Sequence, residues 1–181
     1  MEIFIMPGKR RDSKIKIVNA KKEDVSLILS FIKELAEYEK LAGEVTATEN
    51  LLRKTLFGGK SVVKVLLTYY DNEPAGFAVY FYNFSTFIGK PGLYLEDVFV
   101  KPDFRGKGIG KKILIHLARI ARKKDCGRFE WAVLDWNKPA IKFYKNLNAK
   151  SMDEWTVYRL DREAINNLAS VKFKGENFGS K

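Results

Sequence analysis

The stretch GLYLEDVFVKPDFRGKGIGKK, residues 92–112, places a strand, a glycine-rich loop and the start of a helix in direct succession. From Leu93 to Val100 the residues are mostly aliphatic and aromatic, which indicates a strand. Pro102 lacks the N–H that a strand ladder needs, so the strand is expected to end just before it. Apolar residues at helical spacing then predict an amphipathic helix from about Lys111 to Lys124.

The loop between this strand and this helix has the properties of an anion site. Glycines let the backbone approach a phosphate closely, and the first N–H groups of a helix lack partners and favour negative charge. Residues 105–110 have the spacing R-x-x-G-x-G, which is neither the G-x-G-x-x-G of dinucleotide folds nor the G-x-x-x-x-G-K-[ST] of P-loops. A glycine turn that merely leads into a helix would give the same residues.

Length and composition predict one globular domain. The chain has 181 residues, of which 46% are hydrophobic and 30% are charged. We expect a flexible arm over 1–14, the domain over 15–169 and a disordered tail over 170–181. No apolar run approaches the roughly 20 residues of a membrane span, and we expect no signal peptide in the first residues. One cysteine and one histidine exclude a disulfide and argue against a structural zinc site, so we expect a cytoplasmic protein without a metal.

The positive charge is concentrated behind the loop. The chain carries a net charge of +11, and residues 101–128 alone hold ten Lys/Arg and two Asp. A phosphate-rich ligand at the loop would profit from this field. A solvated helix face and a nucleic-acid surface are the alternatives, although no nucleic-acid-binding motif is present.

Residues 31–50 reverse this charge. They contain two lysines and five acids, namely Glu34, Glu37, Glu39, Glu44 and Glu49. A solvent-facing helix side would explain them. The alternative is an acidic rim that attracts a cationic amine.

The rest of the chain reads as alternating strands and helices. The predicted strands are 15–17, 62–70, 75–82, 128–134 and 155–160, in addition to 93–100. The predicted helices are 24–40, 48–56, 137–147 and 161–169, in addition to 111–124, and a loop is expected at 83–91. A strand–helix–strand crossover makes 93–100 and 128–134 parallel neighbours.

This order of elements and the R-x-x-G-x-G loop resemble the GNAT superfamily of N-acetyltransferases. The resemblance covers residues 15–168 and includes IKELAEYEKL, YLEDVFV, VLDWNKPAIKFYKNLNAK and EWTVYRLD, which are similar to the diamine acetyltransferase branch. It implies an α/β (α+β) GNAT fold, with a mixed, largely antiparallel sheet flanked by helices. It also implies acetyl-CoA as co-substrate, direct acetyl transfer to a small cationic amine such as a polyamine, diamine or thialysine, and a homodimer. A protein N-terminal or lysine acetyltransferase and a non-catalytic acyl-CoA-binding module are the alternatives.

Amine acetylation needs a base for the ammonium proton, stabilisation of the oxyanion and an acid for the leaving thiolate. The resemblance assigns the base, acting through water, to Glu96, and places Glu96 and Asp97 at the amine. In a regular strand these neighbours point to opposite faces, so only a bulge would bring both to one cleft. A structural role for Asp97 is the alternative.

The resemblance also assigns the acid and the acetyl-CoA site. It makes Tyr144 the general acid, since a phenol is neutral at pH 7 and can donate a proton; a packed core tyrosine is the alternative. It places Trp155 near the amine; a position in the core is the alternative for this residue. It places Asn137 near acetyl-CoA, and the helix cap that Asn137 is expected to form would be sufficient to explain it. The remaining residues that it assigns to acetyl-CoA are Val98, Phe99, Val100, Arg105, Gly106, Lys107, Gly108, Ile109, Gly110 and Lys111, together with Tyr144.

Two reactive residue types are set aside. Cys126 follows Gly110 by 16 residues, at the far end of a helix that rises about 1.5 Å per residue, so an acyl-cysteine is not expected. His116 lies between apolar neighbours without a partner, and we assign it no role.

Overall fold

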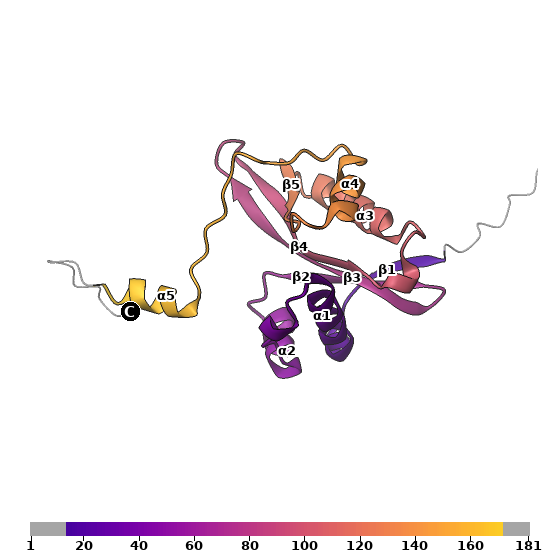
Figure 1. Cartoon of the computed structure of the whole chain (residues 1–181), viewed down its shortest axis with the longest axis horizontal. Helices are drawn as coiled ribbons and strands as arrows, with labels where there is room; N and C mark the ends of the chain where they lie inside the picture. Colours follow the sequence, from indigo (N-terminus) through magenta and orange to yellow (C-terminus); the bar gives the residue numbers. More distant parts are fainter. Residues whose placement is uncertain (1–13, 172–181) are drawn as a thin grey trace, which may run out of the picture. The chain divides into compact units, whose positions relative to one another are not determined.

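The protein is described by a computed structural model that covers residues 14–171 (Figure 1). The chain divides into two compact units, with the boundary between Ala132 and Val133, and each is described by itself. The expected arm over 1–14 and tail over 170–181 lie almost entirely outside the described residues. The single domain over 15–169 stays a prediction.

The first unit is built on a five-stranded sheet with the order β1-β2-β3-β4-β5. Helices α1 and α2 cover one side of the sheet and α3 the other (Figure 1). Its elements are β1 (Ile15–Asn19), α1 (Val25–Glu39), α2 (Glu49–Phe57), β2 (Lys64–Tyr70), β3 (Glu73–Ser85), β4 (Lys90–Val100), α3 (Ile109–Lys123) and β5 (Arg128–Trp131), with short 3₁₀ turns η1 (Lys22–Asp24), η2 (Ala42–Glu44) and η3 (Pro102–Phe104).

The sheet confirms the predicted fold class. The pairs β1–β2, β2–β3 and β3–β4 are antiparallel, and β4–β5 is parallel. The parallel pair follows from the crossover through α3, which returns the chain to the same end of the sheet. The C-terminal end of β4, the loop and the start of α3 therefore lie at one end of the sheet.

The core between α1 and the sheet is aromatic. Apolar residues at helical spacing bury one face of α1, and Phe31 from this face is fully buried. Its ring stacks on Phe77 of β3 at a centroid distance of 5.5 Å and meets the edge of Phe99 of β4 at 6.4 Å. These contacts fix α1 against β3 and β4.

On the opposite side of the sheet, α3 buries Ile109, Ile113 and Leu117. Ile109 is the first helical residue, so the helix begins two residues before the predicted Lys111. The sequence pattern missed this start because Gly108 and Gly110 disfavour a helix by propensity, whereas burial of Ile109 fixes it. The last loop glycine is therefore part of the helix.

The predicted loop over 83–91 is wrong. Strands β3 and β4 pair through this stretch, with Phe84 opposite Pro91, and only residues 86–89 form the turn. Proline is tolerated because its carbonyl faces the β5 side, where it accepts from the Gly127 N–H at 2.8 Å, and ladder pairing with β5 begins only at Gly92, so no ladder N–H is required of Pro91.

The second unit contains α4 (Lys138–Lys145) and α5 (Arg162–Ala169). Both helices were predicted, and the side chains of Asn137 and Asp161 cap them by accepting N–H bonds from Ala140 and Ala164. The predicted strand 155–160 is absent from the described part of the chain. Trp155, Val157 and Tyr158 in this stretch are 70%, 86% and 91% exposed, and a strand without a paired neighbour has no ladder to stabilise it.

Truncation of Phe77 to alanine should lower the free energy of unfolding by about 3–5 kcal/mol, because it removes the stacked partner of Phe31 and leaves a cavity. Phe77→Leu should cost clearly less. Phe87→Ala is the matched control: this ring is 95% exposed, so its loss should change stability by less than about 0.5 kcal/mol. Chemical denaturation measures all three, and equal losses for Phe77→Ala and Phe87→Ala would contradict the assignment of the core.

Candidate active site

The glycine-rich loop is tied to the sheet at its start. The Lys101 N–H donates to the Ala75 carbonyl of β3 at 2.9 Å, and residues 102–104 then form a 3₁₀ turn that the Arg105 N–H closes on Pro102. Pro102 occupies the first turn of this helix, where its missing N–H is not needed. These contacts fix the position at which the loop begins after β4.

Two glycines give the loop its curvature. Gly106 and Gly108 have φ angles of +75° and +81°, a left-handed conformation that glycine adopts without strain. Within the described residues, the amides of residues 106–108 donate to no other backbone group, and the first amides of α3 have no partner inside the helix. Consecutive N–H groups of this kind at a helix start can bind an anion.

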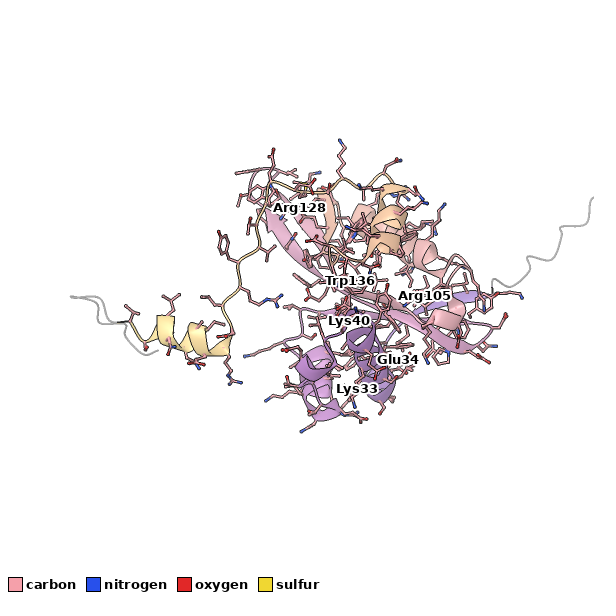
Figure 2. All side chains as sticks on the ribbon, viewed as in Figure 1. Lys33, Glu34, Lys40, Arg105, Arg128 and Trp136 are labelled. Atoms are coloured by element: carbon pink, nitrogen blue, oxygen red, sulfur yellow. The ribbon has the colours of Figure 1, made fainter. Side chains whose placement is uncertain are left out.

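Arg105 holds the loop from outside. Its Nε donates to the Val100 carbonyl at 3.0 Å, and its guanidinium lies 4.4 Å from the ring centroid of Tyr38 on α1 (Figure 2). The arginine of the R-x-x-G-x-G pattern therefore connects the loop, the end of β4 and α1. In this position it shapes the site rather than pointing a free charge into it.

The lysines near the loop differ in their surroundings. Lys107 lies 5.0 Å from the ring centroids of both Tyr70 and Phe104, while Lys111 is exposed on the first turn of α3. Lys112 donates to the Ile15 carbonyl of β1 at 2.8 Å. Lys107 and Lys111 thus flank the loop with positive charge, and Lys112 joins α3 to the sheet.

Strand β4 contains the bulge that the two adjacent acids require. Val79 of β3 lies opposite Asp97, but the next residue, Tyr80, lies opposite Leu95, so Glu96 is an extra residue in β4. A bulge of this kind leaves one residue unpaired and changes the direction of the side chains around it. Glu96 is exposed and Asp97 is half-buried.

The bulge creates an acidic cluster of Glu96, Asp97 and Glu39. Burial, the largest cause, and the negative charges of Glu96 and Glu39 together raise the pKa of Asp97 to about 6. Burial also raises the pKa of Glu39, the last residue of α1. A carboxylate in this situation is stabilised by a nearby cation, so the cluster favours a positively charged ligand.

The rest of the predicted acidic rim is dispersed. Glu34, which is labelled in Figure 2, forms an ion pair with Lys101 at 3.5 Å. Glu37, Glu44 and Glu49 are exposed. Only Glu39 of the five acids is placed beside the bulge. The segment 31–50 therefore contributes one carboxylate to the candidate site instead of a continuous rim.

The two parallel strands separate beside the bulge. Pairing between β4 and β5 runs from Gly92/Arg128 to Leu95/Trp131 and ends there, whereas β4 continues to Val100. Val98, Phe99 and Val100 remain paired with β3 on their other side. From residue 96 onward, the edge of β4 that faces β5 has no strand neighbour within the described chain, and an extended ligand could pair with it.

The remaining predicted site residues belong to the second unit. Asn137 caps α4, and Tyr144 is half-buried in the last turn of α4, with its ring 5.4 Å from that of Phe143. Trp155 is 70% exposed and lies in no strand. Its alternative assignment as a core residue is therefore wrong.

The residues that were set aside stay outside the bulge and the loop. The Cys126 thiol is half-buried, and both burial and Asp125 raise its pKa, so it resists forming the thiolate. His116 is half-buried on α3, where burial and Arg119 lower its pKa. Among residues 14–171, no group of three or more His, Cys, Asp or Glu side chains is arranged to hold a metal ion. In the same range, no helix has the length and apolarity needed to span a membrane.

Two contributions of α1 were not singled out by the sequence analysis. Glu39 was treated as one acid among five, and Tyr38, which stacks on Arg105, was not considered. The signal for Glu39 was present: it follows Leu35 by four residues and Ala36 by three, which places it near the buried face of the helix.

Comparison with known proteins agrees with this geometry. Residues 30–149 match the profile of the Acetyltransferase (GNAT) family. The thialysine N-epsilon-acetyltransferase of Sus scrofa is 40% identical over 166 residues, which cover 86% of this chain and 97% of the relative. The L-ornithine N5-acetyltransferase NATA1 of Arabidopsis thaliana is 30% identical and is matched over 87% of this chain and 88% of its own length.

Solved structures show the same fold. An integron cassette protein from the mobile metagenome of V. cholerae, VCH_CASS6, superposes with a TM-score of 0.73 at 31% identity, over 87% of this chain and 99% of that one. An aminoglycoside acetyltransferase from an uncultured soil metagenomic sample superposes with a TM-score of 0.69 at 18% identity, over 83% and 99% of the two chains. The family match, the extended relatives and the fold agree, and the chain belongs to the Acetyltransferase (GNAT) family of N-acetyltransferases.

Proposed function

We propose that this protein transfers the acetyl group of acetyl-CoA directly to a primary amine of a small cationic substrate: a diamine, a polyamine or a thialysine-like amino acid. The bulge at Glu96 carries the proposal, because it sets the half-buried Asp97 beside Glu39 next to an unpaired strand edge and an anion-binding loop. Anion and cation sites side by side suit a phosphate-bearing acyl donor and an ammonium acceptor.

The residues present fit acetyl-CoA. The amides of Gly106, Lys107 and Gly108, with those of Ile109, Gly110 and Lys111 at the start of α3, would hold its phosphates. The unpaired edge of β4, at Val98, Phe99 and Val100, would bind the extended pantetheine arm as a strand binds its neighbour. Arg105 would act through the loop that it anchors, and Asn137 is proposed to contact the arm.

When bound, acetyl-CoA supplies the activated acetyl thioester. We assign to Glu96 the role of base: through a water molecule it accepts the proton that the substrate ammonium must lose. The amine nitrogen then bonds to the acetyl carbon, the carbon–sulfur bond breaks, and Tyr144 donates its proton to the leaving sulfur. The high pKa of the Cys126 thiol argues against an acyl-cysteine and supports direct transfer.

The substrate class rests on the acidic cluster and on the relatives. Three carboxylates, two of them with pKa values raised by burial, favour a cation over a neutral ligand. The thialysine and L-ornithine acetyltransferases named above act on small amines, and we extend this chemistry to the present chain. Trp155 is proposed to contact the amine, although it lies in the second unit.

We further propose that the protein is a homodimer in the cytoplasm. The segment 152–160 exposes several large apolar side chains, namely Met152, Trp155, Val157, Tyr158 and Leu160. Exposed apolar patches of this kind commonly mark a protein interface. A second copy of the chain would remove them from water.

The proposed reaction is tested by thiol release from acetyl-CoA with spermidine, putrescine, thialysine, lysine and a peptide with a free N-terminus. We expect saturable release with at least one small amine. Tyr144→Phe should lower kcat at least about tenfold, since loss of a general acid costs about 10²–10⁴-fold. The control Tyr82→Phe, at an exposed tyrosine of β3 outside the proposed acetyl-transfer site, should not change kcat. Release with the peptide alone would instead indicate a protein acetyltransferase, and bound acetyl-CoA without any release would indicate a non-catalytic module.

The pH dependence of kcat/KM tests Asp97. Because its pKa is raised to about 6, the carboxylate forms only above that pH, and kcat/KM for a small amine should rise from about pH 5 to 7. The amine itself stays cationic over this range, since its pKa lies near ~10. Asp97→Asn should remove this rise and lower kcat/KM at pH 7.5 by about 10- to 100-fold, as loss of a charged hydrogen bond does. The matched control is Asp71→Asn, on the exposed turn after β2, and persistence of the rise in Asp97→Asn would contradict the assignment.

The homodimer is tested by light scattering coupled to size exclusion. We expect twice the mass of one chain for the wild type. The double variant Val157→Asp/Tyr158→Asp should shift the protein towards the monomer, because burying two carboxylates in an apolar interface is unfavourable. Val62→Asp, at an apolar residue of the first unit that is 74% exposed, should leave the mass unchanged. A monomeric wild type would refute the proposal.

A further inference from the structure

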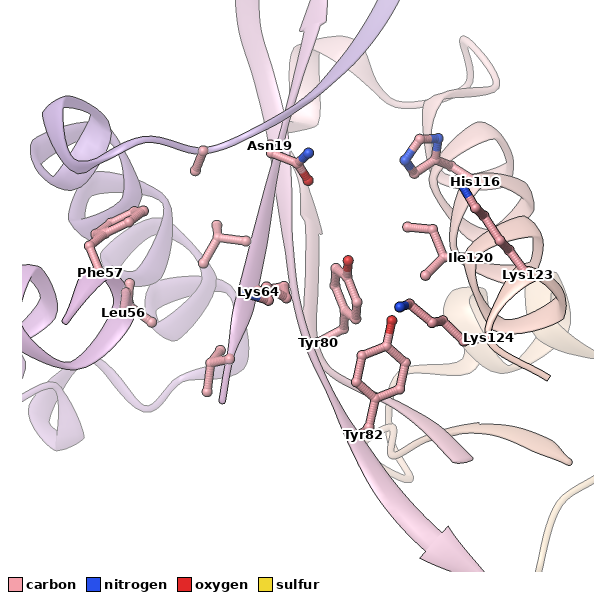
Figure 3. Close-up of a pocket in the computed structure, with 13 residues that line it drawn as sticks. Asn19, Leu56, Phe57, Lys64, Tyr80, Tyr82, His116, Ile120, Lys123 and Lys124 are labelled. Carbon is pink, nitrogen blue, oxygen red and sulfur yellow. The ribbon is translucent and has the colours of Figure 1, made fainter. Parts of the chain in front are cut away.

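A hollow of ≈ 690 Å³ lies in the first unit at the edge of the sheet (Figure 3). We call it the β2-edge hollow. It exists because β1 is short: its last residue, Asn19, lies opposite Leu66, so Lys64 at the start of β2 has no β1 residue opposite it. The C-terminal half of α3 and the end of α2 line the space beside this open edge.

The β2-edge hollow is separate from the proposed acetyl-transfer site. None of the residues of the glycine-rich loop or of the bulge lines it. Tyr80, which does, lies opposite Leu95, while its neighbour Val79 lies opposite Asp97. Because successive residues of a strand point to opposite faces, Tyr80 and Asp97 belong to opposite sides of the sheet.

Tyr80 offers the hollow a hydroxyl that has no hydrogen-bond partner among the described residues. Its side chain is 95% removed from solvent, at 5% exposure, and Figure 3 shows its hydroxyl directed into the hollow. Within residues 14–171 this hydroxyl makes no hydrogen bond. Its ring meets that of Tyr82 edge-on at 6.1 Å, and the Tyr82 hydroxyl also points into the space. Burial raises the pKa of both phenols, so both are neutral donors at pH 7.

The charge around the hollow is uniformly positive. Lys64, Lys123 and Lys124 line it, and no Asp or Glu of the described part of the chain does. His116 adds an imidazole that its lowered pKa keeps neutral at pH 7. Cations and hydrogen-bond donors without any acid favour an anionic group.

Apolar side chains line the hollow on both sides of the β2 edge. Ile120 of α3 lies on the same side of the sheet as Tyr80, and Leu56 and Phe57 of α2 lie on the other side, where they pack against the core that contains Val79 (Figure 3). Small-molecule sites commonly have volumes of about 300–1,000 Å³ and combine apolar walls with a few polar groups. The hollow has both properties.

We propose that the β2-edge hollow binds a small amphipathic anion, whose carboxylate or phosphate lies beside Lys123, Lys124 and the tyrosine hydroxyls and whose apolar body packs against Ile120 and the tyrosine rings on the same side of the sheet. This site is independent of the acetyl transfer proposed above, so either proposal can fail alone.

The full-length chain contains one histidine, His116, which makes it a clean reporter inside the hollow. We would follow its imidazole resonance by NMR during titration with octanoate and octyl phosphate, which share an apolar chain and differ in their anionic head. At least one should give a saturable shift with a dissociation constant below about 1 mM. Octylamine, with the same chain and opposite charge, and acetate, without the apolar body, should not.

Variants locate the binding. Lys123→Glu/Lys124→Glu should weaken the bound anion at least about tenfold, and Tyr80→Phe, which removes only the hydroxyl, at least about threefold. Lys16→Glu/Lys33→Glu makes the same change of charge at two exposed lysines outside the hollow and should bind as the wild type does. All variants should keep the wild-type circular dichroism spectrum. The proposal is overturned if neither anion shifts His116 saturably, if octylamine binds equally well, or if folded Lys123→Glu/Lys124→Glu binds unchanged.

Discussion

The extra residue in β4 is the constraint on which the candidate site depends. Without Glu96 in the register, Asp97 would continue the regular alternation of the strand, and the two acids would face opposite sides of the sheet. The bulge can persist because the flanking residues are fixed: Leu95 and Phe99 are buried, and Phe99 packs on Phe31. Aromatic packing between α1 and the sheet thus stabilises the irregularity on which the proposed chemistry depends.

The same packing brings charge of both signs to one end of the sheet. Helix α1 delivers Glu39 towards Asp97 and also presents Tyr38 to the guanidinium of Arg105. Arg105 in turn fixes the loop on the carboxyl end of β4 through the Val100 carbonyl. The proposed cation site and the proposed anion site are therefore both built from one helix, one strand and one loop, all within the first unit.

Much of this was predictable from sequence because local rules determined it. The strand, loop and helix around the glycines, the parallel pair and the caps at Asn137 and Asp161 follow from turn chemistry, periodicity and connectivity. From the sequence, a bulge could be inferred as necessary if both Glu96 and Asp97 were to reach one cleft. Its position could not be predicted, because the register of β4 depends on its pairing with β3. The predicted strand over 155–160 failed for the converse reason: its residues have strand propensity, yet a strand forms only where a neighbour pairs with it. The hollow beside Tyr80 results from the unequal lengths of β1 and β2, which periodicity does not fix.

The unequal lengths of β1 and β2 affect how the sheet behaves at high protein concentration. Strand β1 has five residues and β2 has seven, so the beginning of β2 presents backbone groups from which another chain could extend the sheet. The residue at this place is the exposed Lys64. If copies of the chain paired through this edge, the Lys64 ammonium groups would lie about one strand spacing apart. Their mutual repulsion opposes such pairing. The lysine that borders the hollow therefore also protects the fold against aggregation.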